Sequence, residues 1–95
     1  MNPDLQVVPR LNGHFRLQWE PAQDCYVLLY PEGMVKLNGS AGLILSNVDG
    51  QRSLGSIIGE LSRQFPDVDS ISEDVVTFIK TARAQRWIEV DDAAS

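Results

Sequence analysis

Residues 25–38 read CYVLLYPEGMVKLN and contain two strand-like segments joined by a turn sequence. The first segment, residues 25–30, is rich in aromatic and β-branched side chains and apolar on both faces, which is typical of a strand covered on both sides. The sequence Pro31-Glu32-Gly33 is typical of a three-residue hairpin connection, in which proline presets φ and Gly33 takes the left-handed conformation. We therefore predict that residues 34–37 form a short strand antiparallel to residues 25–30.

Another strand is predicted just before this hairpin. In residues 14–20, Phe15, Leu17 and Trp19 alternate with polar side chains, so one face is directed at a core and the other at water. A polar turn at residues 21–24 then leads into the central strand of a three-stranded meander. The last strand of that meander has one unpaired edge, and an unpaired edge is a template for a further strand.

After residue 37 the apolar period changes from 2 to 3.6, which predicts three helices. Asn38 is expected to cap the first helix, which ends at Gly50. Ser53 is expected to cap the second, whose apolar stripe includes Phe65 and stops before Pro66. The third helix is expected to begin at a capping box of Ser70 and Glu73. Its apolar stripe consists of Ile71, Val75, Phe78, Ile79 and Ala82.

Residues 87–90 are predicted to close the domain as an extended segment, followed by a frayed polar tail. The fold class is therefore α+β and winged helix-turn-helix-like, with a three-stranded antiparallel β meander followed by three α-helices. The length of 95 residues fits a single domain, residues 1–95. We expect its ordered part to run from about residue 9 to about residue 90.

Charge and composition exclude several classes of partner. The chain has 8 basic and 13 acidic residues and a formal charge of -5, which argues against nucleic acid or an anionic membrane as a partner. The third predicted helix begins with Glu73 and Asp74, where a DNA-recognition helix would contact bases. No apolar run is long enough to span a bilayer, and the first residues lack the pattern of a signal peptide. We expect a cytoplasmic protein.

The residues that most often carry catalysis are scarce. Cys25 is the only cysteine and His14 the only histidine, so an internal disulfide and the usual metal-site spacings are absent. No third group that would orient a Cys–His pair is visible, and no glycine-rich nucleotide loop is present. We predict that the chain is not an enzyme; a small enzyme that uses Cys25 or His14 is the alternative.

The hairpin and its surroundings closely resemble the pyrroloquinoline quinone (PQQ) biosynthesis protein D family. The most specific part is LLYPEGMVKLN at residues 28–38, and the resemblance runs from about Pro9 to Val90. Further residues that carry it are FRLQWE at 15–20, Ser40-Ala41, Ile44-Leu45, Asp49-Gly50, Asp74-Val75 and Trp87-Ile88.

Members of that family are small, non-catalytic peptide chaperones, the recognition element of pathways for ribosomally made, modified peptides. The resemblance implies that this chain binds the PQQ precursor peptide. It also implies that the chain presents the peptide to a radical S-adenosylmethionine enzyme, which crosslinks a Glu and a Tyr of the peptide. Iron–sulfur clusters and S-adenosylmethionine belong to that enzyme, because a cluster needs several thiolates and this chain has one. No cofactor is therefore expected here.

A binding mode follows if the peptide adds as a strand to the edge of residues 34–37. Main-chain hydrogen bonds then give affinity, and alternate side chains enter a groove against the third helix. Lys36, Lys80 and Arg83 suit an acidic peptide. The expected peptide-binding residues are Met34, Val35, Lys36, Leu37, Val75, Phe78, Ile79, Lys80, Ala82 and Arg83. The helix residues line either the groove or the core, since both share one face of the helix.

A competing interpretation is a self-associating structural module. The same free edge can pair with a second copy, or the hairpin can swap between two chains, and either gives a homodimer.

Overall fold

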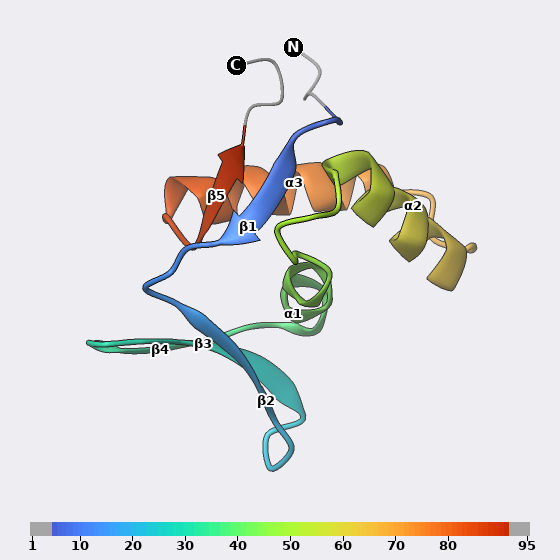
Figure 1. Cartoon of the computed structure of the whole chain (residues 1–95). Coiled ribbons are helices and arrows are strands. Elements are labelled where there is room, and N and C mark those ends of the chain that lie inside the picture. The colour runs from blue at the N-terminus through green and yellow to red at the C-terminus, as the bar shows by residue number, and fades with distance from the viewer. Residues whose placement is uncertain (1–4, 92–95) are drawn as a thin grey trace.

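The computed structural model describes residues 5–91. The elements follow one another as β1 (Val8–Leu11), β2 (Arg16–Glu20), β3 (Cys25–Tyr30), β4 (Gly33–Lys36), α1 (Gly39–Ser46), α2 (Leu54–Gln64), α3 (Ile71–Ala84) and β5 (Ile88–Asp91). An antiparallel sheet has the order β2-β3-β4, and a separate antiparallel ribbon pairs β1 with β5. In Figure 1, α1 lies between the three-stranded sheet and the layer formed by α2, α3 and the β1–β5 ribbon. The predicted α+β arrangement, a β meander followed by three helices, is confirmed.

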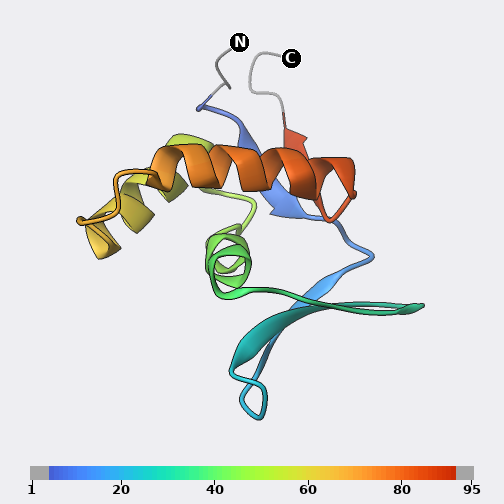
Figure 2. The same ribbon diagram turned by 180° about the vertical axis from the view of Figure 1, so that it is seen from behind.

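The meander buries one face against α1. Leu17, Leu28 and Val35 lie opposite one another in the ladder, and all three belong to the core or pack against it. No element of residues 5–91 lies over the other face of this sheet (Figures 1 and 2). Val27 on that face is nevertheless as fully buried as Leu28 on the face toward α1, so the centre of β3 is buried on both faces, as predicted for this strand.

One core joins the sheet to the helices. It consists of Leu28, Leu37, Ala41, Ile44, Leu45, Leu54, Ile57, Leu61, Val75, Ile79, Ala82 and Ile88. Burial of large aliphatic side chains from every helix is the main stabilising contribution, at about 25 cal/mol per Å² of apolar surface. None of the helices among residues 5–91 is long and apolar enough to cross a membrane.

Two of the predicted helix caps are present and one is not. The Asn38 side chain accepts from the Ala41 N–H (2.7 Å), and the Ser53 side chain accepts from the Ser56 N–H (3.1 Å). The capping box at the start of α3 does not form. Ser70 has a ψ of 12°, outside the extended region that an N-cap residue normally adopts, and its hydroxyl donates to the Asp74 carboxylate instead.

Several predicted boundaries also move. Gly33 pairs with Tyr30 as the first residue of β4, so the hairpin turn contains only Pro31 and Glu32. The first helix ends at Ser46, and Gly50, with φ of +78°, lies in the loop that follows. Phe65 is 39% exposed because α2 ends one residue before it, so its predicted place in the core is wrong.

The extended segment predicted at residues 87–90 is confirmed as β5, but its partner β1 was not predicted. Pro9 removes one backbone donor from residues 8–11, and the apolar alternation there is weak. The pairing is reinforced by an ion pair of Arg10 with Glu89 (3.3 Å). The predicted frayed tail falls almost entirely at residues 92–95, which lie outside the described residues, as do residues 1–4.

Candidate functional site

β4 is an edge strand whose outer side has free backbone groups. The Leu37 N–H donates to the Tyr26 carbonyl (3.0 Å), which makes these two residues a hydrogen-bonded pair. Such pairs alternate along an antiparallel ladder, so Val35 also bonds to β3. The N–H and C=O groups of Met34 and Lys36 therefore point away from β3. No strand of residues 5–91 pairs with that side of β4, which thus offers two donors and two acceptors.

A groove lies at the end of this edge. It has a volume of about 420 Å³ and is open to solvent. Figure 2 shows β4 running into the N-terminal end of α1, with α3 beyond it. The lining residues come from that end of α1 and from one flank of α3: Asn38, Ser40, Ala41, Ile44, Asp74, Thr77, Phe78 and Thr81. Apolar side chains are thus surrounded by hydroxyl, amide and carboxylate groups.

The helix residues predicted for binding divide between the groove and the core. Phe78 lines the groove and its ring contacts that of Trp87, with 6.4 Å between the centroids. Val75, Ile79 and Ala82 are buried in the core, at most 6% exposed. The structure therefore places these three under the surface, which is one of the two positions that the apolar stripe allowed.

The strand residues divide in the same way. Val35 and Leu37 point toward the core side of the sheet, half-buried and buried respectively. Met34 and Lys36 point to the opposite, uncovered face, and Met34 is 54% exposed. All four still contribute backbone to the β4 segment, but only Met34 and Lys36 present backbone groups at its free edge.

Lys80 and Arg83 are exposed on α3 but do not line the groove. Among residues 5–91, the only charged side chain that lines it is Asp74. The sequence analysis did not select Asp74, Thr77 and Thr81 for the site. Their spacing was the available signal: together with Phe78 they follow the i, i+3, i+4, i+7 pattern of one helix flank. That flank lies beside the apolar stripe rather than on it.

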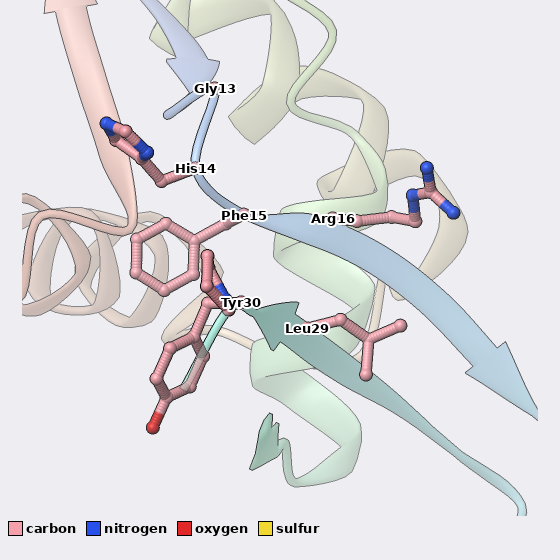
Figure 3. A pocket seen from close by; sticks show the side chains of 7 residues that line it. Gly13, His14, Phe15, Arg16, Leu29 and Tyr30 are labelled. Carbon is pink, nitrogen blue, oxygen red and sulfur yellow. The ribbon is translucent and has the colours of Figure 1, made fainter. Parts of the chain in front are cut away.

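A second hollow, of about 310 Å³, lies where β2 begins and β3 ends. Its lining includes Phe15 and Tyr30, whose ring centroids are 5.5 Å apart, together with His14, Arg16 and Leu29. Figure 3 shows His14 and Arg16 pointing in opposite directions, so the two nitrogen-bearing side chains do not converge on one ligand. The groove beside β4 is the better candidate site.

Cys25 and His14, the two residues considered for catalysis, lie at opposite ends of the β2–β3 ladder. Cys25 lies level with Glu20 in the β2–β3 ladder, and Leu29 lies level with Arg16. At about 3.3 Å per residue, these two positions are about 13 Å apart, and His14 lies beyond Arg16. Within residues 5–91, no three His, Cys, Asp or Glu residues gather in a way that could hold a metal ion.

The sequence was compared with models of known protein families to find the family to which the chain belongs. The family model described as Coenzyme PQQ synthesis protein D (PqqD) matches residues 25–88, from β3 to the start of β5. The chain belongs to the PqqD family. The resemblance seen in the sequence is therefore confirmed, and the β4 edge, α1 and the α3 flank all lie within the matched PqqD region.

Individual relatives cover nearly the whole chain. A protein of Pseudomonas paraeruginosa named PqqA binding protein is 58% identical over 88 residues, which is 93% of this chain and 96% of that protein. The PqqA binding protein of Azotobacter vinelandii is 56% identical over 86 residues, 90% of this chain and 94% of that protein.

A solved structure shares the PqqD fold. It is the solution NMR structure of the PqqD truncation of Methylobacterium extorquens PqqCD, described as a functional and stand-alone recognition element for ribosomally synthesized and post-translationally modified peptides. The TM-score is 0.71 at 28% sequence identity, and the match covers 86% of this chain and 88% of that chain.

Proposed function

We propose that this chain binds the PqqA precursor peptide as an added strand on β4 and presents it to a radical S-adenosylmethionine enzyme. The observation that carries the proposal is the free edge of β4, which leads directly into a groove lined by α1 and α3. The relatives named PqqA binding protein supply the identity of the peptide. Because the precursor peptide is made on ribosomes, we infer that it binds this chain in the cytoplasm.

Strand addition explains how a small surface can hold a flexible peptide. The N–H and C=O groups of Met34 and Lys36 hydrogen-bond to its main chain, and every second peptide side chain turns toward the helices. Ala41, Ile44 and Phe78 offer apolar contacts in the groove, which gain about 25 cal/mol for each Å² removed from water. The peptide is held extended, with its opposite face available to an enzyme.

The role is recognition without catalysis. Chemistry on the bound peptide belongs to the partner enzyme, which supplies the iron–sulfur cluster and S-adenosylmethionine. The chain raises the effective concentration of the peptide at that enzyme and fixes its backbone conformation, which lowers the entropic cost of reaching the reactive geometry.

The test is a calorimetric titration of the chain with synthetic PqqA peptide. Lys36→Pro removes one outward-facing N–H without removing a β3–β4 hydrogen bond, and proline is tolerated at a sheet edge. Lys36→Ala is the matched control, because it removes the same side-chain charge and keeps the N–H. We expect Lys36→Pro to weaken binding about tenfold or more relative to Lys36→Ala, since a main-chain hydrogen bond is lost and the ring obstructs the edge.

Equal affinities of the two variants, with both folded by circular dichroism, contradict strand addition at β4. Absence of binding by the unmodified chain contradicts the proposal as a whole.

A second copy of the chain is the competing occupant of the same edge, because the backbone groups of Met34 and Lys36 can pair with those of another β4. Light scattering over a concentration series distinguishes the two uses. Peptide binding as the main use predicts a monomer at micromolar concentration, with or without peptide. A dimer that dissociates when peptide is added shows that the two occupants compete, and a dimer unaffected by peptide favours the self-associating module.

A further inference from the structure

The main-chain hydrogen bonds of an edge strand do not by themselves fix the position of a peptide. Met34 and Lys36 present the same N–H and C=O groups to any peptide. If the peptide shifts by two residues, all of these hydrogen bonds form again and each peptide side chain stays on the same face of the sheet. A strand can also add in either direction. Some side-chain contact must therefore select one register, and the groove at the end of β4 is the nearest structured surface to supply it.

Of the residues that the structure describes, one charged side chain lines the groove, and it is negative. Asp74 lies beside Thr77, Phe78 and Thr81 on the groove flank of α3. Its Oδ2 accepts from the Ser70 hydroxyl at 2.9 Å. None of the ion pairs found within residues 5–91 includes Asp74; these pairs are Arg10–Glu89, Arg52–Asp49 and Arg63–Glu60.

The cations of the expected site do not neutralise this carboxylate. Lys80 follows Asp74 by six residues and Arg83 by nine, which is about 9 Å and about 14 Å along the helix axis. Lys36 points to the uncovered face of the sheet, opposite the side that packs on α1. A carboxylate can only accept hydrogen bonds, so its best partner is a charged donor.

We propose that Asp74 sets the register of the bound peptide by pairing with a lysine or arginine side chain of that peptide. This inference rests on the proposed function. The first groove residue, Asn38, follows Lys36 by two positions, so the paired peptide residue lies about two or more places beyond the one opposite Lys36. The groove therefore selects a basic side chain, whereas Lys36, Lys80 and Arg83 had suggested an acidic peptide.

The experiment compares Asp74→Asn with Glu73→Gln by calorimetry against synthetic PqqA peptide. Asn keeps the acceptor oxygen for the Ser70 hydroxyl and removes only the charge. Glu73 is the matched control, because it is also an exposed acid in the first turn of α3 but does not line the groove. We expect Asp74→Asn to weaken binding about fivefold at low salt and less at high salt, as one solvated ion pair would, and Glu73→Gln to change it less than twofold.

A set of peptides, each with one Lys or Arg replaced by norleucine, identifies the paired residue. One replacement should weaken binding to the unmodified chain about fivefold and leave binding to Asp74→Asn unchanged, as expected for a coupled pair.

Two results overturn the inference while the proposed function stands: equal effects of Asp74→Asn and Glu73→Gln, or replacements that all act equally on the unmodified chain and on Asp74→Asn. If the unmodified chain binds no peptide, the proposed function is wrong and the inference falls with it.

Discussion

At the scale of single residues, Asp49 organises the loop between α1 and α2. Its Oδ1 accepts from the backbone N–H groups of Arg52 (2.8 Å) and Gln51 (2.9 Å). These hydrogen bonds, with the nearby Arg52 charge, hold the pKa of the Asp49 carboxyl below its ordinary value of 3.8. The Arg52 guanidinium also donates to the Asn47 side chain (2.9 Å), so the loop is tied to the C-terminal end of α1.

We predict that acid removes the stabilisation that Asp49 supplies. Because its pKa is lower in the folded chain than in the unfolded chain, the contribution is present above pH 3.8 and is lost as the pH falls through the folded pKa. Asp49→Asn should therefore be less stable than the unmodified chain near neutral pH, with a difference that shrinks below about pH 4. Urea unfolding of both chains across this range measures it. A stability difference that does not change with pH contradicts the prediction.

The charged residues show how far single positions can be interpreted from sequence. Lys80 and Arg83 stood out because a helix ending in basic residues suggests an acidic partner, yet neither lines the groove. Asp74 was used in the sequence analysis as an acid at the start of the third helix that argues against DNA binding, and the structure shows that it lines the groove. The apolar period of a helix shows which of its residues face inward. The position of the groove depends on how α1 and α3 pack together, and the sequence pattern of one helix holds no information about that packing.

At the scale of elements, two helix glycines differ in the space around them: Gly42 is in tight contact with the sheet, and Gly59 has open space beside it. A Cβ at Gly42 in α1 would lie 2.9 Å from Cδ2 and 3.0 Å from Cβ of Tyr26 on β3, so α1 and β3 approach too closely for any side chain. A Cβ at Gly59 in α2 would have no neighbour within 4 Å. The first glycine permits packing of α1 on the sheet, while the second only weakens its helix.

We predict opposite effects of alanine at these two positions. Gly59→Ala should raise the free energy of unfolding by about 1 kcal/mol, because alanine restricts the unfolded chain and favours the helix. Gly42→Ala should lower it by about 1 to 3 kcal/mol, because α1 must move away from Tyr26. Urea unfolding of the two variants provides the comparison, and each is the control for the other. Changes of the same sign would contradict this account of the two helices.

Structural features that depend on residues close together in the sequence could be predicted. The hairpin of β3 and β4 and the caps Asn38 and Ser53 depend on neighbouring residues, and the structure has all of them. The pairing of β1 with β5 depends on residues about eighty positions apart, and the short segment with Pro9 has no periodicity to reveal it. The failed capping box at Ser70 shows that the right spacing can be overruled when the side chain finds another partner, here Asp74.

At the scale of the whole molecule, the groove lies where two parts of the chain meet. One part is the three-stranded sheet with α1, and the other is α2 and α3 with the β1–β5 ribbon (Figures 1 and 2). Asn12 links them between β1 and β2: its N–H donates to the Trp87 carbonyl and its side-chain amide donates to the Arg86 carbonyl, both at 2.9 Å. A ligand that contacts β4, α1 and α3 together therefore contacts both parts.

Within the described part of the chain, the three-stranded sheet has two unpaired edges, and the proposal places the peptide at the β4 edge. On β4 the outward-facing backbone groups are those of Met34 and Lys36, and by the same alternation those on β2 belong to Leu17 and Trp19. Only the β4 edge leads into the groove lined by α1 and α3. The two edges thus provide a test site and an internal control within a single molecule.

Residue-resolved amide hydrogen exchange with and without PqqA peptide tests strand addition most directly. In the free chain, Val35 and Leu37 should exchange slowly because their N–H groups bond to β3, and Met34 and Lys36 should exchange quickly. Saturating peptide should slow Met34 and Lys36 to the rates of their neighbours and leave Leu17 and Trp19 unchanged. Protection that appears at Leu17 and Trp19, or that leaves Met34 and Lys36 exchanging quickly while peptide is bound, would contradict strand addition at β4.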